Sequence, residues 1–117
     1  MTKKSRVKKS DLSQQKCAPC AKGTPRLSGK ALNEITRRLT GKWQVKGKKQ
    51  LEKAFKFPDF LKALQFTNQV GKIAEKEGHH PDVYLSYGEV RLQLSTHSVG
   101  GLSENDFILA AKVNQIK

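Results

Sequence analysis

Long hydrophobic runs are absent from this chain of 117 residues, and cysteines are few. The longest uninterrupted apolar stretch is only a few residues, which excludes a membrane-spanning helix. Two cysteines are too few for the disulfide framework of a small secreted domain. The basic N-terminus also has no hydrophobic segment behind it, as a secretory signal would have. We therefore expect a cytoplasmic protein without membrane contact.

Acidic residues are scarce in the first half of the chain. Residues 1–50 hold 15 basic and 2 acidic side chains, whereas residues 51–117 hold 8 of each. The formal net charge of +13 therefore belongs entirely to the first half. This asymmetry argues against a uniformly basic nucleic-acid-binding globule and favours a basic tail joined to a roughly neutral domain.

Residues 1–27 have almost no periodic apolar positions, and we expect a disordered or loosely attached arm there, followed by a folded domain over residues 28–117. The basic arm predicts weak, salt-sensitive contact with nucleic acid or another acidic surface, or else a merely solubilising role. Its Cys17-Ala-Pro-Cys20 supplies two of the four ligands usual for zinc, and it lacks the strand and helix that flank a redox motif. The role of this motif stays open.

Capping and turn residues divide the domain into seven elements. Ser28 is a plausible N-cap for a helix over residues 30–39, and alternating apolar residues on either side of Gly47 indicate a hairpin over 43–57. Asp59 is suited to capping a second helix over 60–76, which Gly78 ends. We place the inward stripe of this helix on a set of apolar residues, namely Phe60, Leu61, Leu64, Val70, Ile73 and Ala74.

The last third of the chain repeats the pattern of hairpin and helix. Residues 83–94 alternate on either side of Gly88-Glu89, which suits a tight turn, and Ser103-Glu-Asn-Asp106 is typical of a capping box before a final helix. The order α-β-β-α-β-β-α predicts an α+β fold, with a four-stranded antiparallel sheet and three helices packed on one face. Because about 90 residues make a thin core, we also expect self-association.

The three histidines of the chain all lie at predicted element ends, where His79 and His80 follow the second helix and His97 follows the last strand. If the strand stays regular to its end, His97 points away from the core. With Glu75 and Asp106 nearby, a converging His cluster would suit proton transfer. The same residues also fit a polar corner and a capping box, and three histidines with a carboxylate could bind zinc, although their spacing is poor for a metal.

The run from Glu75 to Asp106 resembles the signature of the pterin-4a-carbinolamine dehydratases. Three residues separate Glu75 from His79-His80-Pro81, and Tyr87, His97 and Asp106 follow at the spacing of the family. Ser95-Thr96-His97, the stretch from Gly101 to Glu104 and the stretch from Phe55 to Phe60 are also similar to family sequence. The resemblance covers about residues 28–116 and implies the same fold, in homodimers or homotetramers.

The resemblance implies loss of water from a 4a-hydroxytetrahydropterin to give a quinonoid dihydropterin, the recycling step for the cofactor of aromatic amino acid hydroxylases. His79 and His97 would transfer protons, and His80, the third histidine of the catalytic set, would hold the pyrimidine side of the pterin. Glu75 and Asp106 would orient imidazoles. The expected substrate-binding residues are Gly78, His79, His80, Pro81, Ser95, Thr96, His97 and Ser98. Pterin is then the substrate, and neither a metal nor an organic cofactor is expected.

Two residues depart from the family pattern. Gly78 stands where many members have an acidic residue, and Val83 stands where some have a Trp. These departures bear on the pocket wall and not on the proton-transfer positions. Because relatives on this fold also act as dimerisation partners of transcription factors or as assembly factors, a non-catalytic partner role is the alternative function.

Overall fold

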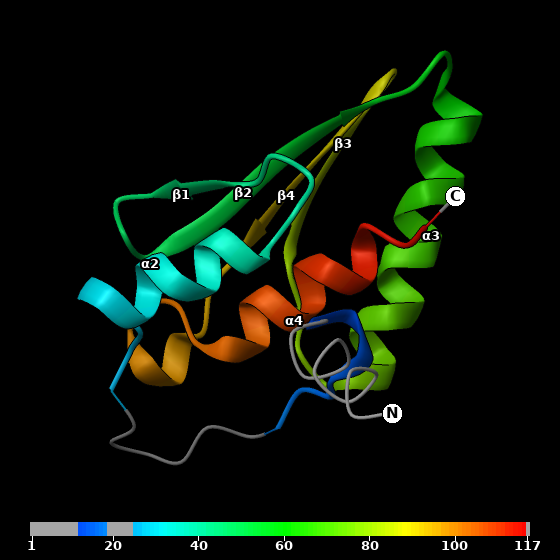
Figure 1. Ribbon diagram of the computed structural model, residues 1–117. Coiled ribbons are helices and arrows are strands. Elements are labelled where there is room, and N and C mark those ends of the chain that lie inside the picture. Colours follow the sequence, from blue (N-terminus) through cyan, green and yellow to red (C-terminus); the bar gives the residue numbers. More distant parts are fainter. Residues whose placement is uncertain (1–11, 19–24, 117) are drawn as a thin grey trace, which may run out of the picture.

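The computed structural model describes residues 12–18 and 25–116 of the chain. Within that part, a four-stranded antiparallel sheet lies on one side of three α-helices (Figure 1). The elements, in which η denotes a short 3-10 helix, are η1 (Leu12–Gln14), α2 (Gly29–Arg38), β1 (Gln44–Lys46), β2 (Gln50–Lys56), α3 (Phe60–Glu77), β3 (Asp82–Ser86), β4 (Glu89–Leu94), η2 (His97–Val99) and α4 (Glu104–Val113). The predicted α-β-β-α-β-β-α order and α+β class are confirmed.

The sheet has the strand order β1-β2-β4-β3, so β2 and β4 are central and β3 is an edge strand. Successive side chains of a strand point to opposite faces. In the central strands one face is apolar and turned to the helices, and its fully buried side chains are Leu51, Val90, Leu92 and Leu94. The other face carries polar residues such as Glu52 and Gln93, which lie opposite each other across β2 and β4. This alternation explains why the helices cover a single face.

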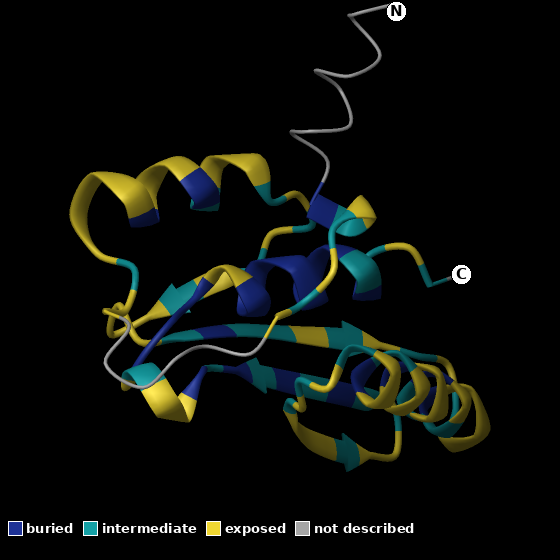
Figure 2. Ribbon diagram, turned by 90° about the horizontal axis from the view of Figure 1, so that it is seen from below, coloured by how far each residue is buried: buried dark blue, intermediate teal, exposed yellow. Residues whose placement is uncertain are grey.

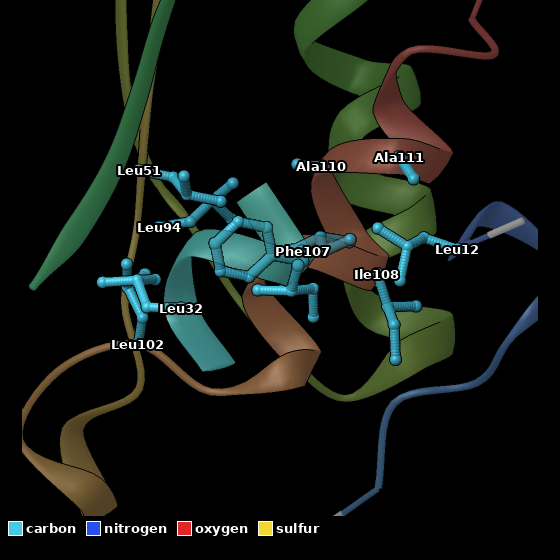
Figure 3. Close-up of a cluster of buried hydrophobic side chains, with 11 residues drawn as sticks. Leu12, Leu32, Leu51, Leu94, Leu102, Phe107, Ile108, Ala110 and Ala111 are labelled. Atoms are coloured by element: carbon cyan, nitrogen blue, oxygen red, sulfur yellow. The ribbon is translucent and has the colours of Figure 1, made fainter. Parts of the chain in front are cut away.

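Helix α4 forms the centre of the molecule and is buried almost all round (Figure 2). It lies against α2, α3 and η1, and its fully buried Phe107 packs with Leu51 and Leu94 of the sheet (Figure 3). Removing this apolar surface from water is the main favourable contribution to folding. No helix in the described residues is long and apolar enough to cross a membrane.

The helix ends follow the capping residues of the sequence. Asp59 accepts a hydrogen bond from the Lys62 amide at 2.8 Å and starts α3. Gly78 ends α3 in the left-handed conformation (φ 67°), which glycine adopts without steric cost. Ser103 and Asp106 form the predicted capping box of α4. Ser28 occupies the N-cap position of α2, but its side chain makes no capping hydrogen bond.

Two local predictions were wrong. The turn of the second hairpin is Tyr87-Gly88 and not Gly88-Glu89, because Glu89 already pairs with Ser86 in the sheet. In α3, Phe60 and Leu61 are exposed, because the first turn of the helix lies at the end far from α4 (Figure 1). The buried residues of α3 are Val70 and Ala74, which the predicted stripe included, and Ala63 and Phe66, which it did not.

Residues 12–18 and 25–27, the described part of the expected arm 1–27, make contacts with the rest of the protein. Leu12 is 3% exposed and packs beside Ile108 and Ala111 of α4 (Figure 3). Leu27 donates its amide hydrogen bond to the Leu102 carbonyl at 2.8 Å. The strongly basic stretch 1–11 and Cys20 lie outside the described residues, so the expected contact with acidic surfaces and the domain boundary at residue 28 stay predictions.

The Asp59 cap gives a first testable prediction. We expect Asp59→Ala to lower the free energy of unfolding by about 1 kcal/mol, because the Lys62 amide loses its acceptor at the start of α3. Asp59→Asn keeps a side-chain oxygen at this position and should remain close to the wild type. Urea denaturation of the three proteins measures the difference, and equal losses in both variants would contradict the capping role.

Candidate functional site

The centre of the candidate site is the hydrogen bond between His79 and Asp106. Atom Nε2 of His79 lies 2.6 Å from Oδ1 of Asp106, and their side chains are 12% and 0% exposed. His79 follows the end of α3, whereas Asp106 lies in the first turn of α4. An ionised carboxylate only accepts hydrogen bonds, so Nε2 carries the hydrogen and Nδ1 of the neutral ring has the lone pair. Asp106, one of the two carboxylates expected to orient an imidazole, thus contacts His79.

Two further donors hold the buried carboxylate of Asp106. Its Oδ2 atom accepts from the Thr96 hydroxyl at 2.8 Å and from the Ser103 amide at 3.0 Å. Because the hydrogen of Thr96 points to Asp106, Ser103 must donate its own hydroxyl to Thr96 Oγ1, at 2.8 Å. A buried charge is tolerated when its hydrogen-bonding capacity is filled in this way.

His80 pairs with a different carboxylate, in a more open environment. Its Nε2 atom lies 2.5 Å from Oε2 of Glu75, and the two side chains are 59% and 78% exposed. Contacts between such exposed groups contribute little to stability. Glu75 therefore contacts the second histidine of the pair, while Asp106 contacts the first.

His97 lies at the start of η2 and is exposed to solvent. Strand β4 ends at Leu94, so the regular strand that the sequence suggested up to His97 is not present. A bridge between Thr96 and Gly101 closes the loop instead. His97 is outside the core as expected, but the reason is the turn of η2 and not strand alternation.

A cavity of about 310 Å³ lies beside His79. Its lining residues are Cys17, Ala18, Glu77, Gly78, His79, Thr96, Ser98 and Asn105. The cavity thus brings together Gly78, His79, Thr96 and Ser98 from the expected substrate-binding set. The other members of that set, His80, Pro81, Ser95 and His97, do not line it, although His97 lies in the chain between the lining residues Thr96 and Ser98.

Four lining residues were not predicted from the sequence: Cys17, Ala18, Glu77 and Asn105. Cys17 donates its amide to Oε1 of Glu77 at 2.9 Å. Asn105 clamps Ala18 by two hydrogen bonds to its backbone. Its Oδ1 accepts from the Ala18 amide at 3.0 Å, and its Nδ2 donates to the Ala18 carbonyl at 2.6 Å. These contacts use the backbone of residues 17 and 18, so no side-chain pattern in the sequence indicated them.

Glu77 is the charged group that connects the end of α3 with α4 and with the residues around Cys17. Its side chain is 9% exposed, and Oε2 lies 3.5 Å from Nζ of Lys112 on α4. The amide of Cys17 lowers the pKa of Glu77 most, burial opposes this effect, and Lys112 lowers the pKa further. Lys112 in turn donates to the Ser13 carbonyl at 2.9 Å.

The departure of Gly78 from the family pattern is explained by the end of α3. Gly78 has a positive φ of 67°, and a Cβ atom built there would meet nothing within 4 Å. Glycine therefore allows the left-handed conformation at the end of α3, and because it has no side chain it leaves the adjacent space open. Within residues 12–18 and 25–116, no three His, Cys, Asp or Glu side chains group as a metal site would require.

Comparison with known proteins gives a consistent picture. The family model described as pterin 4 alpha carbinolamine dehydratase matches residues 25–116. A protein of Alkaliphilus metalliredigens that is provisionally named as such a dehydratase is 48% identical over 105 residues, 90% of this chain and 95% of its own. A relative from Rickettsia canadensis with the same provisional name is 46% identical over 102 residues, 87% of this chain and 94% of its own.

A solved structure extends the similarity to the fold. The crystal structure of a transcriptional coactivator/pterin dehydratase from Brucella melitensis has a TM-score of 0.69 and 41% identity, over 76% of this chain and 95% of that one. The match to the Alkaliphilus protein spans 90% of the present chain, so it begins no later than residue 13. The similarity to this relative therefore includes Cys17 and Ala18, whereas the resemblance read from the sequence began near residue 28.

Glu77 gives a prediction of pH dependence. Because its pKa is lowered in the folded protein, its contribution to stability is present above the ordinary glutamate pKa of about 4.3 and is lost as the pH falls through the lower folded value. We expect Glu77→Gln to cost about 1 kcal/mol near neutral pH, with the difference from wild type shrinking in acid.

Urea denaturation between about pH 3 and pH 7 measures this difference. Glu34→Gln, at an exposed position of α2, is the matched control and should stay close to the wild type throughout. A Glu77→Gln difference that does not change with pH would contradict the assigned role of the charge.

Proposed function

We propose that this chain, which belongs to the pterin 4 alpha carbinolamine dehydratase family, removes water from 4a-hydroxytetrahydrobiopterin. The product is the quinonoid dihydropterin, which a reductase can return to the tetrahydro form. This places the protein in the recycling of the cofactor of aromatic amino acid hydroxylases. The proposed location is the cytoplasm.

The reaction needs two proton transfers and no electron transfer. The hydroxyl at C4a leaves as water after it receives a proton, and the proton on N5 is removed as the C–N double bond forms. One protein group therefore acts as an acid and another as a base. Imidazoles, whose ordinary pKa is about 6.5, serve both roles near neutral pH. The pterin is the substrate, and the proposal involves neither a metal nor an organic cofactor.

The observation that carries the proposal is the His79–Asp106 contact on the wall of the cavity. Asp106 holds the ring of His79 at 2.6 Å and fixes the hydrogen on Nε2, so the neutral ring offers Nδ1 as its basic nitrogen. Asp106 is itself fully buried and held by Thr96 and Ser103. Such a preorganised imidazole is what a proton-transfer step requires.

We assign the second proton-transfer position to His97 and the pyrimidine side of the pterin to His80. Exposure leaves the ring of His97 accessible to a ligand, and the adjacent Thr96 and Ser98 line the cavity. His80 neighbours His79 in the chain and contacts Glu75, which would orient its ring. Gly78, Pro81 and Ser95 complete the proposed binding set around these histidines.

The test is the dehydration assay on the wild type and on His97→Ala. Removal of a general acid or base lowers the rate by about 10²-fold to 10⁴-fold, and we expect a loss of kcat in this range. His97 is exposed, so the melting temperature should hardly change. Asn33→Ala, at an exposed position of α2, is a control that should keep full activity. A wild-type protein that gives only the uncatalysed rate would overturn the proposed function.

A partner-binding role on the same fold is the second candidate. The name of the Brucella structure combines a transcriptional coactivator with a pterin dehydratase. In the present chain, exposed apolar residues lie on edge strand β3 and its turn and at the start of α3, namely Val83, Tyr84, Tyr87, Phe60 and Leu61. These residues also offer contact surface for the proposed homodimer or homotetramer.

The two candidate functions separate in one experiment. We expect any specific protein partner to bind wild type and His97→Ala equally, because His97 lies outside the exposed apolar residues. Substituting Tyr84 by Asp should weaken partner binding or self-association while dehydration continues. Light scattering and co-purification measure these effects. Loss of dehydration in Tyr84→Asp without any loss of association would contradict this separation.

A further inference from the structure

Residues 12–18, which we call the N-terminal segment, lie across the ends of α3 and α4. Leu12 is the buried anchor of the segment, at 3% exposure, and the remaining described contacts of the segment use mainly its backbone. Glu77 receives the Cys17 amide, Asn105 clamps Ala18, and Lys112 donates to the Ser13 carbonyl. The segment is therefore attached at three points to α3, whose end precedes His79, and to α4, which carries Asp106.

The N-terminal segment also forms part of the cavity beside His79. Cys17 and Ala18 line the cavity together with Gly78, Thr96 and Ser98. Asn105 both lines the cavity and clamps Ala18, so the position of the segment and the shape of the cavity depend on the same side chain. The volume of about 310 Å³ is at the lower end of ligand pockets, so one wall has a large effect on which ligands fit.

We propose that the N-terminal segment is a specificity-determining wall of the substrate cavity, which binds the bicyclic pterin through Cys17 and Ala18 and excludes water from His79. This inference rests on the proposed function for the identity of the ligand. The ring of His79 is held by Asp106 and not by the segment. Release of the segment should therefore weaken binding of substrate and transition state together, which raises KM and leaves kcat almost unchanged.

The first test releases the segment in the full-length protein through Leu12→Ala. Leu12 is outside the lining of the cavity, so the substitution reaches the cavity through the position of the segment. We expect KM to rise about tenfold, the equivalent of about 1.4 kcal/mol, with kcat within about twofold of wild type. Leu32→Ala is the matched control, because Leu32 is 5% exposed in the same core cluster but belongs to α2. It should lower the melting temperature and leave KM unchanged.

The second test narrows the cavity without removing the anchor. Ala18→Trp keeps the backbone contacts with Asn105 and places a large side chain at the cavity wall. We expect KM to rise here as well, by about tenfold or more. Ala31→Trp makes the same exchange at an exposed position of α2 and should leave KM unchanged. The comparison of Ala18→Trp with Ala31→Trp tests the inference even where Leu12→Ala reduces folding.

Binding of a fully oxidised pterin, followed by fluorescence, separates this inference from the proposed reaction. A wild type that binds the oxidised pterin without dehydrating the carbinolamine overturns the reaction, while the dissociation constants of the variants still decide the inference. Unchanged KM and unchanged dissociation constants in both Leu12→Ala and Ala18→Trp overturn the inference alone. A wild type that neither binds nor dehydrates overturns both.

Discussion

The buried carboxylate of Asp106 is the constraint on which the candidate site depends. A fully buried charge costs several kcal/mol unless donors surround it, and here the donors come from three different parts of the chain. His79 follows α3, Thr96 follows β4, and Ser103 starts α4. Satisfying one carboxylate therefore brings the ends of three elements together. The same group completes the capping box, so the start of α4 and the orientation of His79 depend on one another.

As a result, the three histidines differ in how firmly the structure holds their rings. His79 is 12% exposed and held by a buried partner, whereas His80 pairs with Glu75 at 59% and 78% exposure. Water competes with the second contact and screens it, so the ring of His80 is held less firmly. His97 is exposed on η2. The fold thus fixes one imidazole before substrate arrives and leaves the other two free to adjust to a ligand.

Local chemistry in the sequence was sufficient for the order of the elements, whereas the convergence of His79, His80 and His97 on one pocket stays a prediction. Asp59, Gly78 and Ser103 mark helix ends that the structure confirms, because caps act through near neighbours. It was harder to predict which residues of α3 face the core, because Phe60 continues the apolar stripe but lies too far from α4 to contact it. The N-terminal segment was missed for a different reason. Apart from the burial of Leu12, most of its contacts join backbone groups of Ser13, Cys17 and Ala18 to distant side chains, and backbone groups leave no pattern in a sequence.

The reliance of the N-terminal segment on backbone contacts separates the shape of the cavity from its chemistry. Glu77 and Asn105 hold the amides of Cys17 and Ala18 whatever side chains those positions carry. Gly78 adds open space on the same side, because its left-handed conformation serves the end of α3 and no Cβ fills the gap. The wall can therefore vary in size at positions 17 and 18 without disturbing Asp106 or His79. Under the proposed function, substrate preference and proton transfer would therefore depend on different residues.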